Sequence, residues 1–240
     1  CEKNGDGGNL SAQIMQTVSV VIAAFYEDAT IGEVVESAKL YADEVVVVCD
    51  SEADPTLEVA KKYGAKTLHN IYGKGKGNAI RFAIDRSESD ILVLMDADGS
   101  HQARDIAKLV EPIREGKAAM ALGSRFMGGS GSDELGSGFS EKVRFFANKL
   151  SAASVNLILG MKLKDINNGF RAIGSEVART LNLREPRFAI ELEMVIKCGK
   201  MKKRIVEVPT YELKRKHGKS RLNSCVQFFD CFSCLIKNSF

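Results

Sequence analysis

Short apolar runs of strand length alternate with segments of helical spacing along most of the chain. Residues 19–24, 44–50 and 91–95 are rich in β-branched or aliphatic residues, which is typical of buried strands. Residues 30–41 place apolar side chains at helical spacing, with Thr30 as a candidate cap. This alternation predicts an α/β fold with a mostly parallel central sheet and helices on both faces. Ligands of such sheets bind beyond the carboxyl ends of the strands.

The same patterns predict further elements. Strands are expected near residues 67–69, 118–123 and 205–208, and helices near residues 56–63, 105–114, 142–159 and 188–199. A further helix is expected to follow a Gly-rich turn and to end near residue 86. A loop is expected at residues 165–170.

Polarity divides the 240 residues into three parts. Residues 1–17 are expected to be a polar tail, and residues 18–222 form one domain, which is long enough to bury a large core. Residues 223–240 are apolar and rich in Phe, and we expect a helical tail that either faces a membrane interface or packs on protein.

No run reaches the roughly 18 apolar residues that span a bilayer, and no signal peptide is visible. We therefore expect a cytoplasmic protein, with peripheral membrane contact as an option.

The net charge of +3 gives no reason to expect nucleic acid as a partner. It conceals an uneven distribution, because residues 1–60 hold twelve acidic and two basic residues, whereas residues 200–221 hold nine basic and two acidic ones. The basic segment is either a solvated face or a surface for phosphates or anionic lipid. The six cysteines are scattered without nearby histidines, which argues against a zinc site and a disulfide framework.

Two carboxylates, Asp96 and Asp98, come directly after the predicted strand at residues 91–95. Hard oxygen ligands at this spacing suit Mg²⁺ or Mn²⁺, which can hold a diphosphate and neutralise a departing nucleoside diphosphate. The alternative is the turn before a helix, with Asp98 or Ser100 as its cap. Residues 73–78 form a Gly-Lys-rich turn before a helix, which is either a phosphate-binding loop or a tight basic turn. Asp50 ends the second predicted strand and could accept hydrogen bonds from a base or ribose, or form a turn.

In combination, these segments resemble the GT-A family 2 glycosyltransferases, most closely the dolichyl-phosphate (polyprenyl-phosphate) mannose and glucose synthases. The matching segments are SVVIAAFYED (19–28), VVCDSEADPT (47–56), GKGNA (75–79), MDADGSH (95–101), GSRF (123–126), DINNGFR (165–171), FAIELEM (188–194), EVP (207–209) and GKSRL (218–222). Cys49 and Ser51 depart from the family pattern.

The resemblance implies a Rossmann-like GT-A fold and an enzyme that moves a hexose from a nucleoside diphosphate-sugar, either GDP-mannose or a UDP-sugar. The implied donor-binding residues are Ala24, Phe25, Glu27, Asp50, Lys76 and Asp96. The implied ligands of Mg²⁺ or Mn²⁺ are Asp96, Asp98 and Ser100. The implied catalytic residues are Asp98, Arg125 and Arg215, and the implied acceptor-phosphate residues are Arg171, Ser220 and Arg221.

Two acceptor classes remain open. A polyprenyl phosphate is already anionic and would attack the anomeric carbon with inversion, so no general base is required. A sugar hydroxyl would need a carboxylate base, for which Glu191 or Glu193 are the candidates unless Glu191 simply faces solvent. A third hypothesis is a non-catalytic nucleotide-sugar binding module. The changes at Cys49 and Ser51 favour it mildly, and the retained residues argue against it: Asp96, Asp98, Arg125 and Arg171.

Overall fold

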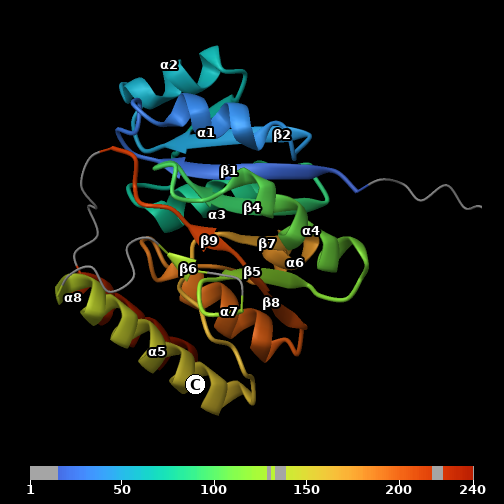
Figure 1. Ribbon diagram of the computed structural model, residues 1–240, viewed down its shortest axis with the longest axis vertical. Helices are drawn as coiled ribbons and strands as arrows, with labels where there is room; N and C mark the ends of the chain where they lie inside the picture. Colours follow the sequence, from blue (N-terminus) through green and yellow to red (C-terminus); the bar gives the residue numbers. More distant parts are fainter. Residues whose placement is uncertain (1–15, 129–130, 133–138, 218–223, 240) are drawn as a thin grey trace, which may run out of the picture.

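The computed structural model describes residues 16–128, 131–132, 139–217 and 224–239. Its main sheet has seven strands in the order β3-β2-β1-β4-β7-β5-β8 (Figure 1). The strands are β1 Val18–Ala24, β2 Glu44–Cys49, β3 Lys66–His69, β4 Ile91–Asp96, β5 Met120–Ser124, β7 Arg171–Gly174 and β8 Ile205–Pro209. The short strands β6 (Gly131–Ser132) and β9 (Tyr211–Glu212) form a separate parallel pair.

All pairings in the main sheet are parallel except those of β7. This strand runs antiparallel between β4 and β5, with Arg171 opposite Leu94 and Leu122. The start of β7 therefore lies at the sheet edge where the parallel strands end. The loop before β7 consequently meets the ends of β4 and β5.

Helices cover both faces of the sheet, which confirms the predicted α/β architecture. Helices α1 (Ile31–Ala38), α2 (Pro55–Lys62) and α4 (Ile106–Arg114) share one apolar core with the sheet. Helices α3 (Lys76–Arg86), α6 (Ser175–Thr180) and α7 (Ile190–Lys200) share the other core. Helices α5 (Phe139–Leu159) and α8 (Ser224–Ser239) pack against each other and against α7 at one end of the molecule (Figure 1).

Side chains at two helix starts connect the loops at the carboxyl edge. Asp54 caps α2 by accepting a hydrogen bond from the Thr56 amide, as Pro55 begins the helix, and its other oxygen accepts from the amide of Tyr26. Thr30 is the N-cap residue of α1, but its hydroxyl donates to the carbonyl of Ala97 at 2.7 Å and makes no cap bond. These contacts fix the loop after β1 against those after β2 and β4.

The apolar C-terminal segment forms α8, in which the thiols of Cys231 and Cys234 are free and buried. None of the described helices combines the length and apolar character that a membrane span requires.

Candidate active site

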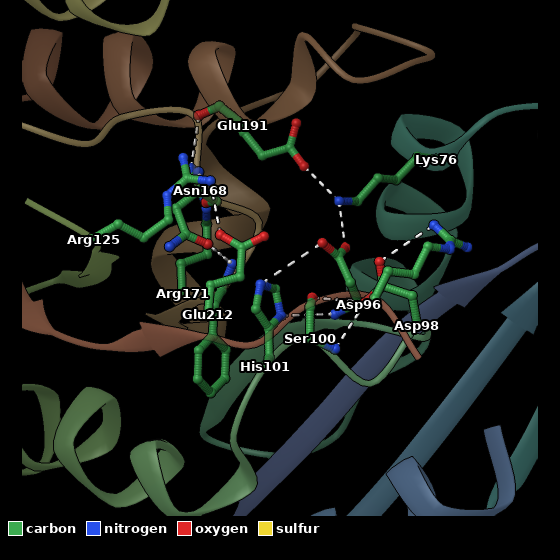
Figure 2. A network of polar contacts seen from close by, with 12 residues as sticks. Lys76, Asp96, Asp98, Ser100, His101, Arg125, Asn168, Arg171, Glu191 and Glu212 are labelled. Carbon is green, nitrogen blue, oxygen red and sulfur yellow. Dashed lines mark hydrogen bonds and ion pairs between the residues drawn. The ribbon is translucent and has the colours of Figure 1, made fainter. Parts of the chain in front are cut away.

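The carboxylate of Asp96, the last residue of β4, is held from two sides. The Lys76 ammonium at the start of α3 lies 2.6 Å from Asp96 Oδ1 (Figure 2). His101 Nδ1 accepts the Asp96 amide hydrogen, and its Nε2 lies 3.8 Å from Asp96 Oδ2. Burial alone would raise the pKa of Asp96, but Lys76 and His101 outweigh burial and hold that pKa below its ordinary value. Asp96 is therefore an anion that already has a cation beside it.

Asp98 lies in the turn that follows β4. Its Oδ1 accepts hydrogen bonds from the amide and the hydroxyl of Ser100, at 3.0 and 2.7 Å. Its Oδ2 lies 3.3 Å from Nη1 of Arg215. Asp98 and Ser100 thus form a turn, but neither caps a helix, because the N-cap residues of the two helices that follow are Gln102 and Asp105. The second oxygen of Asp98 faces a cation from the C-terminal part of the chain.

The segment around Arg215 crosses the loop that carries Asp98. The amide of Leu213 donates to the carbonyl of Ser100 at 2.8 Å, and the amide of Lys216 donates to the carbonyl of Asp98 at 3.2 Å. Arg215 also pairs with Glu27, which follows β1. The basic C-terminal segment therefore packs on acidic residues of the N-terminal half.

The Lys76 ammonium has a second carboxylate partner, Glu191, whose Oε1 lies 2.7 Å away (Figure 2). Burial would lower the pKa of Lys76, but the attraction of Asp96 and Glu191 raises it above its ordinary value. Glu191 lies in the first turn of α7 and is buried, so the expectation that it could face solvent is wrong.

Glu193 is also buried and already has its partners. Its carboxylate accepts hydrogen bonds from the amides of Arg184 and Glu185 and pairs with Lys197 at 2.7 Å. Neither carboxylate proposed as a base for a hydroxyl acceptor is therefore open to a substrate in this conformation.

The Asp50 carboxylate supports the Gly-Lys-rich turn. Its Oδ1 accepts from the Asn70 side chain at 2.8 Å, and its Oδ2 accepts from the amide of Gly75 at 2.7 Å. Of the other expected donor-binding residues, Ala24 is buried at the end of β1 and Phe25 is 45% exposed beyond it. These residues share the carboxyl edge of the sheet with Asp96.

Arg125, at the end of β5, is held by two carboxylates that the sequence analysis did not assign. Its Nε lies 2.8 Å from Oδ2 of Asp165, and its Nη1 lies 2.8 Å from Oε2 of Glu212. The carboxylate of Asp165 is fully buried and accepts a further bond from the Asn148 side chain. The signal for Asp165 was its position at the head of the DINNGFR segment.

Arg171 does not lie where an acceptor phosphate could reach it. The side chain is fully buried, and its guanidinium donates to the carbonyls of Glu191, Ile166 and Asn168. Its Nε has no hydrogen-bond partner among the described residues. The expected phosphate contact is thus replaced by a structural one, because Arg171 ties the loop before β7 to the first turn of α7. Ser220 and Arg221 lie outside the described residues.

The protein's side chains supply only some of the ligands that a metal ion at this site would need. Within the described ranges, no group of three or more His, Cys, Asp and Glu residues is arranged to hold one. Asp96, Asp98 and Ser100 do supply the hard oxygen atoms that suit Mg²⁺ or Mn²⁺, which bind through one or two carboxylates and complete their shell with water and substrate phosphates. These oxygen ligands therefore fit a divalent cation that is also coordinated by the diphosphate of a bound nucleotide.

Several known proteins resemble the chain in sequence. It is 33% identical over 218 residues to a dolichol-phosphate mannosyltransferase of Pyrococcus furiosus, covering 85% of this chain and 59% of that protein. It is 31% identical over 192 residues to an undecaprenyl-phosphate mannosyltransferase of Micrococcus luteus, covering 75% and 76%. It is 29% identical to glycosyltransferase AglJ of Haloferax volcanii, of which it spans 64%.

Solved structures and a family profile complete the comparison. Glucosyl-3-phosphoglycerate synthase from Mycobacterium tuberculosis, in complex with phosphoglyceric acid, superposes with a TM-score of 0.76 at 21% identity, covering 100% of this chain and 86% of that one. The same enzyme with Mn²⁺, uridine diphosphate and phosphoglyceric acid gives 0.75, covering 94% and 79%. This likeness confirms the predicted GT-A fold. The family profile matches residues 19–174, which is more than half of the chain. The chain therefore belongs to glycosyl transferase family 2.

Proposed function

We propose that the protein transfers a hexose from a nucleoside diphosphate-sugar to a polyprenyl phosphate, with inversion and with a divalent metal ion. The observation that carries the proposal is the pair Asp96 and Asp98 at the carboxyl edge of the sheet, facing Arg215 of the basic segment. The relatives named as dolichol-phosphate and undecaprenyl-phosphate mannosyltransferases support the acceptor class. The neighbour crystallised with Mn²⁺ and uridine diphosphate supports the metal and a nucleotide donor.

On the donor side, Ala24, Phe25, Glu27 and Asp50 line the nucleotide in this proposal. Asp96, Asp98 and Ser100 hold Mg²⁺ or Mn²⁺, which when bound neutralises charge on the departing diphosphate. The donor is GDP-mannose or a UDP-sugar. Lys76 lies beside Asp96 and adds positive charge at the same place.

On the acceptor side, Arg125 and Arg215 position two anions that repel each other. Ser220 and Arg221, which lie outside the described residues, are further acceptor-phosphate residues of this proposal. A phosphate acceptor is favoured over a hydroxyl because it needs no base, and the carboxylates of Glu191 and Glu193 are buried and paired with lysines.

Contact with a membrane surface at its cytoplasmic face belongs to the same proposal. Helices α5 and α8 carry exposed large apolar side chains: Phe146, Leu150, Leu157, Ile158, Val226, Phe229, Phe232 and Ile236. Such helices insert an apolar face into the headgroup region. We expect Leu157→Asp to weaken binding to liposomes that contain anionic lipid, whereas Leu40→Asp, an exposed apolar residue after α1, leaves it unchanged. Equal flotation of both variants and the wild type would contradict this contact.

A thermal-shift and calorimetric screen of UDP- and GDP-sugars, with and without Mn²⁺, tests the donor and the metal together. We expect one nucleotide class to bind, to bind more tightly with Mn²⁺, and to lose that gain in Asp98→Asn. Hydrolysis or transfer of the bound donor excludes a non-catalytic binding module. Mn²⁺-independent binding that survives in Asp98→Asn would reject the metal site.

A further inference from the structure

Each aspartate of the Asp96–Asp98 pair is bound by a cation from a distant element, and each cation has a second carboxylate. Lys76 joins Asp96 to Glu191 (Figure 2). Arg215 joins Asp98 to Glu27. The protein's own cations thus lie on both carboxylates that the proposed function assigns to a metal ion. A metal ion that binds there competes with these cations for the same two carboxylates.

We propose that Glu191 is a positioning residue for metal binding that acts through Lys76. It keeps the Lys76 ammonium paired when a divalent cation takes up the carboxylate of Asp96. The inference rests on the proposed function, since it assumes a metal ion at Asp96 and Asp98.

Burial makes a second partner necessary for Lys76. Its side chain is 16% exposed, and the Glu191 side chain is 5% exposed. A buried ammonium that loses its anion is left uncompensated, which is strongly unfavourable. Without Glu191, Lys76 would therefore compete with the metal for Asp96.

The backbone leaves the ammonium little other space. A Cβ atom at Gly169 would lie 3.0 Å from both Lys76 Nζ and Asp96 Oδ2, so the loop before β7 closes over the pair. Lys76 can shift between its two carboxylates, but it is shielded from solvent on this side.

The backbone that carries Glu191 is itself held in place. The Arg171 guanidinium donates to the carbonyl of Glu191 at 2.7 Å and to two carbonyls of the loop before β7. Glu191 therefore stays within reach of Lys76 whatever occupies Asp96. The Glu191 carboxylate, which is too buried to act as a general base for a substrate, would thus serve to hold the Lys76 ammonium.

The test is direct Mn²⁺ binding, measured by the electron paramagnetic resonance signal of free Mn²⁺, with UDP or GDP present and no acceptor. We expect Glu191→Gln to weaken Mn²⁺ binding about 10- to 100-fold, the range seen when partners of metal ligands are removed. The double variant Lys76→Met/Glu191→Gln removes the competing cation, so it binds Mn²⁺ more tightly than Glu191→Gln does. Glu193→Gln is the matched control, because this buried carboxylate of α7 does not touch Lys76, and we expect unchanged affinity.

A merely structural role of Glu191 would not be rescued by removing Lys76. The inference would be overturned if Glu191→Gln bound Mn²⁺ as tightly as the wild type, or if the double variant bound it as weakly as Glu191→Gln. In either case, Mn²⁺ binding by the wild type would leave the proposed function intact. Absence of Mn²⁺ binding by the wild type would overturn the metal-dependent function and the inference with it. If Glu191→Gln does not fold, the double variant is compared with Lys76→Met alone. Without Lys76 there is no cation for Glu191 to hold, so weaker Mn²⁺ binding in the double variant than in Lys76→Met would contradict the inference.

Discussion

The buried ion pair between Arg125 and Asp165 gives a prediction that can be worked out in magnitude. Asp165 is fully buried and accepts hydrogen bonds from the amide, Nε and Nη2 of Arg125, at 3.1, 2.8 and 3.0 Å, and from Asn148 at 3.2 Å. Removing one partner of a buried pair costs about 3–5 kcal/mol, because the other charge is left uncompensated. In Asp165→Asn, Arg125 keeps Glu212, and the amide oxygen still accepts bonds, so we expect the lower end, about 3 kcal/mol.

The assay is urea unfolding followed by circular dichroism, with calorimetry alongside. A loss of about 3 kcal/mol corresponds to a fall in melting temperature of about 6–12 °C for a chain of this length. The matched control is Glu115→Gln, which breaks a surface pair with Lys117 and should cost below about 1 kcal/mol. A loss in Asp165→Asn no larger than in this control would refute the reasoning that the pair holds Arg125 in place.

Three further predictions concern packing, thiol chemistry and ligand removal. Gly77→Ala should lower the free energy of unfolding in urea by about 2–3 kcal/mol, because the new Cβ would lie 2.1 Å from the carbonyl oxygen of Glu185. An unchanged urea midpoint of unfolding would contradict this close approach. Burial raises the pKa of the Cys49, Cys231 and Cys234 thiols to about 12. Iodoacetamide at pH 8 should therefore alkylate these thiols only when the protein unfolds, which peptide mass mapping would show. Alkylation of the native protein at the rate of the unfolded protein would contradict this protection. Chelation by EDTA should abolish most of the thermal shift that the preferred nucleotide causes, and Mn²⁺ should restore it; a shift unaffected by EDTA would speak against the metal.

Most of the sheet could be predicted because its strands are local signals. The apolar runs that became β1, β2, β4 and β5 are buried on both faces, so composition alone identified them. Strand β7 and helix α6 were missed, since four and six residues show no clear periodicity. The antiparallel insertion of β7 between β4 and β5 depends on long-range pairing that spacing does not encode.

The residues of the candidate site also differ in how well the sequence alone could place them. Asp96 and Asp98 could be placed at the carboxyl edge because they follow a strand directly. The pairing of Arg215 with Glu27 joins residues 188 positions apart. The charge asymmetry and the resemblance indicated that both belong to one site, but neither predicted the ion pair. Arg171 was misassigned because a motif names a residue and not the direction of its side chain, which here points into the core.

The most direct test of the central claim is transfer itself. Purified protein is incubated with a labelled nucleoside diphosphate-hexose, Mn²⁺ and a polyprenyl phosphate, and label is counted in the organic phase. The account predicts a β-linked lipid-phosphate sugar from an α-linked donor, formed by the wild type and reduced at least about 100-fold in Asp98→Asn. Equal transfer by Asp98→Asn, or transfer only to a sugar hydroxyl, would contradict it.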